Sequence, residues 1–398
     1  MVSDRNPPNQ VETMITEYEL KAEDIHQMTL SPLRQHLSLK TEGWRCSSEQ
    51  TLNLLVKAAA ESSSLEAICA DTPSAVDGNT LRDQLNAALR VSQLRQQEAE
   101  MNAALQAAIP RGMPRGGLEI AIDTHDEPFY GKSAALLPYV CRGPAKDGTT
   151  RFFRIATAYV IWRDVRLTLS LTYVLPQDRL PAVVARLLAR LSALGLHATV
   201  LYLDKGFCCG AIIRYLQQIN QAAVLACPIR GTLGGTRALC WGRGSYTTDY
   251  TFSDGTVARL LVAELRVLDP QTKRRQQQWL IFVLIQLDWP PYQVITRYQR
   301  RFGIEASYRL LRQTKVLTNS RNPALRFFLL GLSLVLQNIW VLARWLFTRR
   351  QGKGRSKLVP TLLRFDRFRK LLVRAVELLF PPRLSVSVFA SPSFGIHW

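Results

Sequence analysis

The order of apolar runs between residues 118 and 227 constrains the fold more than any other feature of this chain. Three runs of strand length come first, at 118–123, 151–162 and 165–175, and a tight Arg163-Asp164 turn joins the last two. Helical and strand periods then alternate: a helix at 181–194, a strand at 198–204, a helix at 211–219 and a strand at 222–227. Three antiparallel strands followed by strand, helix and strand predict an α/β fold.

This order is that of a ribonuclease-H-like core, which closes with one more helix. Instead, residues 228–289 return to alternating or continuous apolar runs with turn residues between them. We therefore expect an inserted β subdomain at about 229–289, and then a helix that Pro290 and Pro291 open. The glycines of GTLGG and CWGRG predict turns, because no strand-to-helix phosphate loop surrounds them.

The first 110 residues predict an all-α domain. Ser48 and Ser64 are candidate caps of two helices, and Asp77 or Asn79 is the candidate cap of a third. Short helices separated by a polar turn are typical of a helix-turn-helix DNA reader, in which Arg82 of the third helix would contact DNA. An ordinary three-helix packing unit has the same spacing. We expect residues 90–108 to extend the third helix as a connector.

A proline- and glycine-rich linker at 110–117 ends this domain. We therefore expect three regions: a helical, helix-turn-helix-like DNA-binding domain at 1–110, the α/β core at 111–317 and a basic helical region at 318–398. In the last region, residues 324–347 are long and apolar enough to span a membrane. Polar residues interrupt them, so we expect a core helix and no membrane association; they are Arg326, Gln337, Asn338 and Arg344.

The net charge of +20 implies a polyanionic partner, either nucleic acid or an anionic membrane surface. Residues 344–374 carry eleven Lys and Arg against one acid, Asp366. Phe365 and Phe368 lie among them at helical spacing, which predicts a DNA-facing amphipathic helix; a solvated charged face is the alternative. Seven cysteines without a CxxC pair predict reduced thiols, no zinc site and a cytoplasmic protein.

The stretch YQRRFGIEASYRLLR, at 298–312, places four functional side chains on one face of a predicted helix. Tyr298, Arg301, Glu305 and Arg312 follow one another at steps of three, four and seven. On a helix they fall within about 60° of one another. A single carboxylate therefore lies between two guanidiniums and a phenol, although an intrahelical ion pair on a solvated face has the same pattern.

Two aspartates favour a functional role for this helix face over an ion pair on a solvated face. Asp123 ends the first predicted strand and Asp204 the fourth, and these strands would be neighbours in the sheet. The Glu305 helix would pack across the same edge. Three carboxylates at one point repel each other unless a cation lies between them, and oxygen ligands favour Mg²⁺ or Mn²⁺. Two such ions, about 4 Å apart, promote in-line displacement at a phosphodiester.

Other residues near the first strand compete for these roles. Asp126 and Glu127 are alternatives to Asp123, but both lie beyond the apolar run. His125 is a further candidate ligand, although a hydrogen-bonded turn histidine has the same place in the sequence.

Together these residues resemble the DDE transposases of bacterial insertion sequences, in the group with a β insertion before the last acid. The resemblance covers about residues 118–340. Its most specific part is a tyrosine–arginine–glutamate–lysine signature, matched by Tyr298, Arg301, Glu305 and, with Arg in place of Lys, Arg312. Lys315 lies roughly 60° further round the helix and does not replace it easily. LDKGF, which contains Asp204, resembles the second motif of the family.

The resemblance implies a site and its partners. Asp123, Asp204 and Glu305 would be catalytic and would hold two Mg²⁺ or Mn²⁺ ions. Family members bind terminal inverted repeats of double-stranded DNA, usually as a homodimer in a synaptic complex, and join the cut ends to a target. Some form a DNA hairpin, with an aromatic ring stacked on a flipped base, for which Trp279 and Trp289 are candidates. The residues expected to contact DNA are Tyr298, Arg301, Arg312, Lys205, Lys315 and Arg82.

The fold allows two further functions. A structure-specific nuclease would cut DNA without joining strands, and an inactive relative would only bind it. Short inverted repeats flanking the reading frame would separate a transposase from a nuclease. For a transposase we expect a bacterial, cytoplasmic and nucleoid-associated location.

Overall fold

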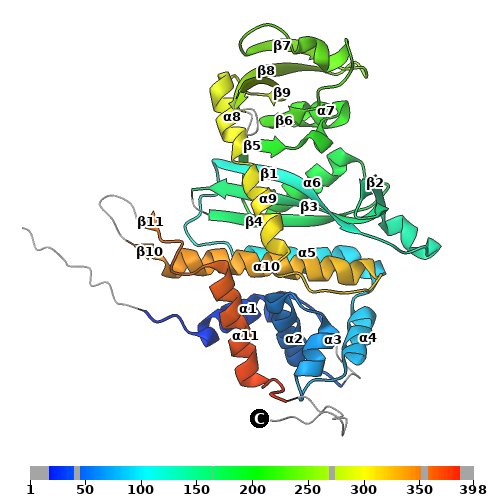
Figure 1. Ribbon diagram of the computed structural model, residues 1–398, viewed down its shortest axis with the longest axis vertical. Helices are drawn as coiled ribbons and strands as arrows, with labels where there is room; N and C mark the ends of the chain where they lie inside the picture. Colours follow the sequence, from blue (N-terminus) through cyan, green and yellow to red (C-terminus); the bar gives the residue numbers. More distant parts are fainter. Residues whose placement is uncertain (1–17, 40–44, 164, 269–273, 351–356, 386–398) are drawn as a thin grey trace, which may run out of the picture.

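The computed structural model describes residues 18–39, 45–163, 165–268, 274–350 and 357–385. Its centre is a nine-stranded mixed sheet with the strand order β2-β3-β1-β5-β6-β9-β8-β7, in which β4 also pairs with β3. Helices cover both faces of this sheet, and a layer of helices from the two ends of the chain lies beyond its β4 side (Figure 1).

The predicted core strands and helices are present within a few residues. They are β1 (Leu118–Pro128), β3 (Thr149–Trp162), β4 (Val165–Val174), α6 (Leu180–Ala193), β5 (Ala198–Leu203), α7 (Gly210–Gln218) and β6 (Ala223–Cys227). The sequence did not predict β2 (Cys141–Lys146), because its CRGPAK segment has no apolar alternation. The predicted Arg163-Asp164 turn lies partly outside the described residues, and Arg163 has a φ of 50°.

Strand pairing brings the two aspartates to the same edge. β1 runs antiparallel to β3 and parallel to β5, with Ile122 paired to Leu203. Asp123 and Asp204 are the next residues on these two strands. Side chains of successive residues alternate between the two faces. α6 and α7 pack on one face, and the two helices at 291–299 and 302–311 pack on the other.

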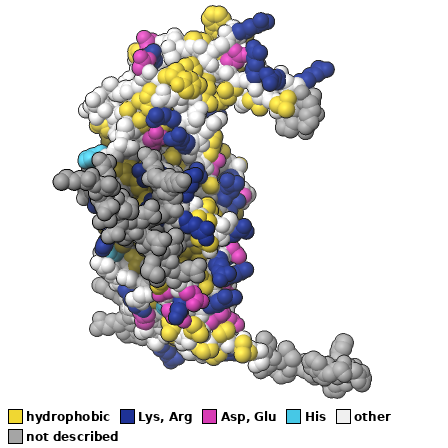
Figure 2. All heavy atoms as spheres, turned by 90° about the vertical axis from the view of Figure 1, so that its left-hand side faces the viewer, with side chains coloured by type: hydrophobic (Ala, Val, Ile, Leu, Met, Phe, Trp, Pro, Cys, Tyr) yellow, Lys and Arg dark blue, Asp and Glu magenta, His cyan; other side chains and the backbone are white. Residues whose placement is uncertain are grey.

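The strands expected between residues 229 and 289 are present, and they extend the central sheet. β7 (Tyr246–Thr251), β8 (Val257–Leu268) and β9 (Arg275–Ile285) form a meander. The C-terminal part of β9, from Ile281 to Ile285, pairs antiparallel with the whole of β6. Without β9, the buried strand β6 would expose a row of unpaired backbone groups at the edge of the sheet. The far end of the β8–β9 hairpin projects from the body beside Lys and Arg side chains (Figure 2).

The closing helix, expected to be continuous from 298 to 312, is two helices. α8 (Pro291–Gln299) and α9 (Phe302–Leu311) are separated by Arg300 and Arg301. The N–H of Arg301 donates to the carbonyl of Tyr298 at 2.9 Å, a contact three residues back that tightens the turn locally. Gly303, the second residue of α9, is a poor helix former.

Five helices precede the sheet: α1 (Ala22–His36), α2 (Ser48–Glu61), α3 (Leu65–Asp71), α4 (Gly78–Ala88) and α5 (Leu94–Ala107). The side chains of Ser64 and Asp77 cap α3 and α4 as predicted, whereas Ser47, not Ser48, caps α2. The prediction that 90–108 extends α4 is wrong. α4 ends because the Leu89 carbonyl accepts from the Asn322 side chain at 3.0 Å, and a short 3-10 turn follows.

The C-terminal helices complete the core that the N-terminal helices begin. α10 (Pro323–Phe347) runs between the sheet and the lower helical layer, and α11 (Phe365–Leu379) packs on α1 and α2 (Figure 1). By length and composition α10 could cross a membrane, but 78% of its most apolar window is buried inside the protein. The predicted boundary at residue 318 therefore passes through one shared hydrophobic core.

The aromatic side chains of α11 belong to this core, so the helix is amphipathic as predicted, and its contact with DNA stays a prediction. Phe365 and Phe368 are buried, and the opposite, exposed face carries basic residues. This exposed set is Arg364, Arg367, Lys370 and Arg374. Beyond α10, β10 (Arg349–Arg350) pairs with β11 (Lys357–Leu358), and the rest of the predicted RRQGKGRSK segment lies outside the described residues.

We expect Phe368→Ala to lower the free energy of unfolding by about 3–5 kcal/mol, because it removes a fully buried aromatic ring between the two ends of the chain. Urea denaturation of the purified protein measures this change. Arg367→Ala, on the exposed face of the same helix, is the control and should change stability by less than about 0.5 kcal/mol. Equal effects of the two substitutions would contradict the packing of α11.

Candidate active site

Asp123 and Asp204 emerge from adjacent parallel strands. Asp123 is largely buried, and its Oδ1 accepts from the backbone N–H of Thr124 at 2.8 Å. Asp204 directly follows β5 and precedes a 3-10 turn, Lys205–Phe207, so its side chain is more exposed. The turn forms where the strand ends because the N–H of Phe207 donates to the carbonyl of Asp204 at 2.9 Å.

Arg301 brings these two acids together with Glu305. One guanidinium nitrogen, Nη1, lies 3.1 Å from Asp123 Oδ2, and the other, Nη2, lies 3.4 Å from Asp204 Oδ1 and 3.2 Å from Glu305 Oε1. The oxygens of Asp204 and Glu305 share one nitrogen and are therefore no more than about 7 Å apart. Three carboxylates from β1, the end of β5 and α9 thus surround a single cation.

The surroundings of Arg301 fix its position. The guanidinium lies over the rings of Tyr298 and Phe302, 5.4 Å from each centroid, and only 4% of the side chain is exposed. The Tyr298 hydroxyl donates to the carbonyl of Leu203 at 3.1 Å, which ties α8 to the end of β5. The Nε atom of Arg301 is buried and has no hydrogen-bond partner within the described chain.

Burial and charge oppose each other in this cluster. Burial raises the pKa of Asp123 to about 6, although Arg301 acts to lower it and Asp204 adds to the rise. Burial also disfavours the charge on Arg301, but Tyr298 and the three acids outweigh it and raise the pKa of the guanidinium. With all three acids ionised, three negative charges face one positive charge, which favours a further cation.

The donor set fits a hard divalent ion. All three candidate ligands are carboxylates, and oxygen ligands suit Mg²⁺ or Mn²⁺. Among the described residues, no group of three or more His, Cys, Asp or Glu side chains is placed to hold a metal ion in this arrangement. The Arg301 guanidinium lies where the three carboxylates converge. Its unpartnered Nε shows that this position does not satisfy all of its hydrogen-bonding groups.

A cavity of about 630 Å³ opens beside the acids, and it contains one of the two candidate stacking residues. Trp279 of β9 lies in its wall, together with Asp204, Lys205 and Glu305. Trp289 does not line this cavity; its ring lies under Arg297, 4.6 Å from the guanidinium carbon. The two tryptophans therefore differ: one is next to the acids and the other packs at the start of α8.

Three residues expected to contact DNA have other positions or partners. Lys315 pairs with Glu127, whose other oxygen lies 3.0 Å from His125 Nε2. Arg82 pairs with Glu66 of α3 at 3.3 Å. Arg312 follows the last residue of α9 and is exposed.

The competing acids near Asp123 are bound elsewhere. Asp126 accepts two hydrogen bonds from Arg154, at 2.6 and 2.8 Å, and Glu127 is held by Lys315 and His125. Both are therefore parts of ion pairs outside the Arg301 cluster, and His125 points to Glu127 and not to the cluster.

Tyr308 is a positioning residue that the sequence reasoning missed. Its hydroxyl lies 2.7 Å from Thr157 Oγ1 and donates to the carbonyl of Asp123 at 3.3 Å, so it connects α9 to β1 and β3. Its position three residues after Glu305 was the available signal, because residues at this spacing share a helix face.

The fold is mixed α/β, with a large mixed sheet and helices at the N-terminus. The structure is similar to piggyBac transposase, solved as a synaptic complex with hairpin DNA. The TM-score is 0.52 at 13% sequence identity, over 89% of this chain and 77% of that chain. No family model and no curated protein matches the sequence. The likeness is one of fold, and membership of a bacterial insertion-sequence group stays a prediction.

We expect Arg301→Gln to lower the free energy of unfolding by about 1–3 kcal/mol in chelator-treated protein, because three carboxylates lose their shared counter-charge. Added Mg²⁺ should then restore more stability to this variant than to the parent protein. Thermal unfolding with and without Mg²⁺ measures both effects. Arg297→Gln, which breaks a pair with Glu119, is the control. A variant as stable as the parent would count against the cluster.

Glu127 should stabilise the protein only above acidic pH. Burial acts to raise the pKa of Glu127, but hydrogen bonds and charge from His125 and Lys315 outweigh it and lower the pKa to about 2. A lowered folded-state pKa gives stability that is complete above the ordinary value of about 4.5 and is lost as the pH falls towards 2.

We therefore expect Glu127→Gln to cost about 2–3 kcal/mol near neutral pH and much less near pH 3. Urea titrations of the two proteins at both pH values measure the difference. A pH-independent difference would show that Glu127 acts through packing alone.

Proposed function

We propose that this chain is a DNA transposase that cuts and joins phosphodiester bonds with Asp123, Asp204 and Glu305. The observation that carries this proposal is the contact of all three carboxylates with one guanidinium, from elements that are far apart in the sequence. The likeness in fold to piggyBac transposase supports the same class. Neither a scaffold role nor a membrane role accounts for three ionisable side chains gathered from β1, the end of β5 and α9.

The proposed cofactors are two Mg²⁺ or Mn²⁺ ions, held by the three carboxylates. When bound, such ions activate a water or 3′-hydroxyl nucleophile and neutralise charge on the phosphate. The chain supplies the arrangement: the β1–β5 register sets the two aspartates side by side, and α9 delivers Glu305 from across the sheet edge. Tyr298 and Tyr308 hold α8 and α9 to these strands through backbone carbonyls.

Arg301 would exchange partners during binding. Its guanidinium now neutralises the acids, and a DNA phosphate offers the bidentate oxygen geometry that a guanidinium prefers. Once cations compensate the acids, the positive charge of Arg301 becomes available to the substrate. Lys205, exposed in the cavity wall, and Arg312, exposed after α9, would add backbone contacts.

The cavity beside the acids would receive a base. Trp279 offers an aromatic face there, and stacking on such a face is worth about 1–3 kcal/mol per base. A nucleotide next to the cut would unstack and turn into this cavity, as hairpin formation requires a sharp reversal of the strand. Trp279 is the residue we assign to this role, because Trp289 lies outside the cavity.

The proposed partners are the ends of a DNA element and its target, bound by a homodimer in a synaptic complex. The net charge of +20 supports a polyanionic partner. A nucleoid-associated, cytoplasmic location in a bacterium follows from the proposal. The presence of short inverted repeats around the reading frame would distinguish this function from that of a nuclease.

We expect Asp204→Asn to reduce cleavage of an element end by about a thousandfold or more, because it removes one charge from the cluster where the reaction is proposed to occur. Binding of the same duplex in a shift assay should be unchanged. Asp249→Asn, an exposed aspartate on β7, is the matched control and should retain full cleavage. Cleavage by the Asp204 variant at the parent rate would refute the proposed site, and cleavage without strand joining would favour a nuclease.

A further inference from the structure

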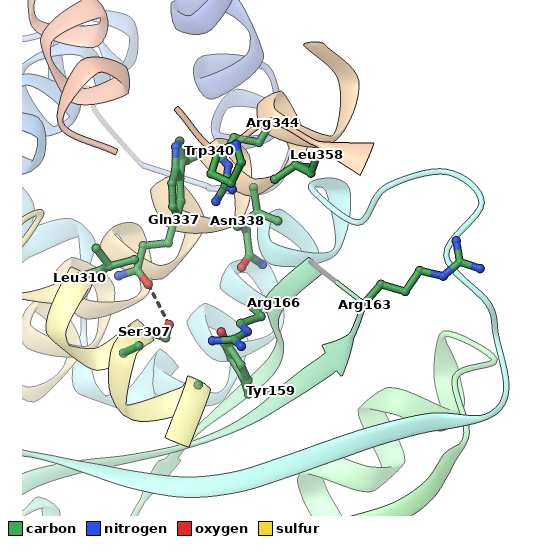
Figure 3. Close-up of a pocket in the computed structure, with 14 residues that line it drawn as sticks. Tyr159, Arg163, Arg166, Ser307, Leu310, Gln337, Asn338, Trp340, Arg344 and Leu358 are labelled. Atoms are coloured by element: carbon green, nitrogen blue, oxygen red, sulfur yellow. Dashed lines mark hydrogen bonds between the residues drawn. The ribbon is translucent and has the colours of Figure 1, made fainter. Parts of the chain in front are cut away.

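A second cavity, of about 320 Å³, lies against a different face of α9 (Figure 3). Gly303, Ser307 and Leu310 of α9 form one side, whereas Glu305 and Phe302 face the cavity beside the acids. The other sides come from the β3–β4 turn, from α10 and from Leu358 of β11. We call it the Arg166 cavity, after the β4 side chain that lies among these residues.

The charge of the Arg166 cavity is positive. Arg163, Arg166 and Arg344 are among its lining residues, and no Asp or Glu is among those that the structure describes. The guanidinium of Arg344 lies over the ring of Trp340, 4.7 Å from the centroid, which fixes its orientation at the cavity wall. In Figure 3 the Arg166 side chain lies near Ser307 and Tyr159, whereas Arg163 points away from the other labelled residues.

Several arginines around the core are paired with acids, whereas Arg166 is paired with none that the structure describes. Arg154 and Arg186 each make two hydrogen bonds to an aspartate, and Arg190 binds Glu98. Within the described chain, no ion pair joins Arg166 to an acidic side chain. Its charge is therefore available to an anion from outside.

The backbone of α9 is adapted to the position of Arg166. A Cβ atom at Gly303 would lie only 3.2 Å from Arg166 Nη1, so the glycine allows the guanidinium to lie close to the helix. Next to it, the side chains of Ser307 and Gln337 hydrogen bond to each other at 2.8 Å and form a polar wall (Figure 3). The cavity combines fixed cations, neutral polar groups and a volume at the lower end of the range of small-ligand sites.

We propose that the Arg166 cavity binds a phosphate group, and that this phosphate belongs to the backbone of the DNA on which the chain acts. The assignment to DNA rests on the proposed function; the phosphate site itself rests on the cavity alone. A guanidinium matches two phosphate oxygens at once. Because α9 also carries Glu305, a phosphate held there would position the backbone relative to the acids without touching them.

The test compares Arg166→Ala with Arg163→Ala in the full-length chain. Both changes remove one exposed arginine from the same turn region, but only Arg166 points into the cavity. Affinity for a short duplex, measured by fluorescence anisotropy over a series of salt concentrations, gives the number of phosphates bound. We expect Arg166→Ala to reduce the salt slope by about one and Arg163→Ala to leave it unchanged. The assay contains a chelator, so its result does not depend on cleavage.

A second measurement separates the two sources of phosphate. Inorganic tripolyphosphate should raise the Tm of the parent protein and of Arg163→Ala, but not that of Arg166→Ala. A lost Tm rise with an unchanged salt slope would keep the phosphate site but assign it to a free phosphate ligand, which overturns the assignment to DNA. The proposal of a phosphate site would be wrong if both variants changed the salt slope equally, or if Arg166→Ala changed neither the salt slope nor the Tm rise. If the Arg166 cavity fails these tests but the parent protein still cleaves the element end, the proposed function stands and only the phosphate site is refuted.

Discussion

The contact of one guanidinium with three carboxylates is the interaction on which this molecule depends. Carboxylates that are closer than about 7 Å repel each other strongly in a partly buried site, and a fold that gathers them needs a compensating charge before any ligand arrives. Arg301 supplies that charge from the turn between α8 and α9, where it reaches the acids of β1, of the end of β5 and of α9 together. The tight turn at Arg300 and Arg301 is thus part of the site.

The sequence predicted most of the central fold because its elements have strong periods. The order of the strands and helices from 118 to 227 agrees with the structure, and Asp204 directly follows β5 as predicted. Asp123 was expected to end the first strand, but β1 continues to Pro128, so Asp123 lies within it, next to the end of the ladder with β5. Contacts between segments that are distant in the sequence were harder to predict. The sequence of residues 229–289 does not indicate that β9 pairs with β6. A strand has the same alternation of side chains whichever strand its backbone pairs with.

The same limit applies to the surroundings of the candidate residues. Phe365 and Phe368 have the spacing of an amphipathic helix, and spacing alone does not say whether the apolar face meets a core or a ligand. Lys315 and Arg82 carry the charge expected of DNA contacts, but Glu127 and Glu66 approach them from other elements. Arg301 was correctly placed on the face of Glu305, whereas its contact with both aspartates required the three-dimensional structure.

The pairing of β9 with β6 has a mechanical consequence for the region around the acids. β6 also pairs with β5, so the strand that bears Trp279 and the strand that ends at Asp204 are two ladder steps apart, about 10 Å in total. A continuous hydrogen-bonded lattice resists shear, and no hinge lies between these strands. The two strands that carry the indole and the carboxylate are therefore held at a fixed separation by the sheet itself.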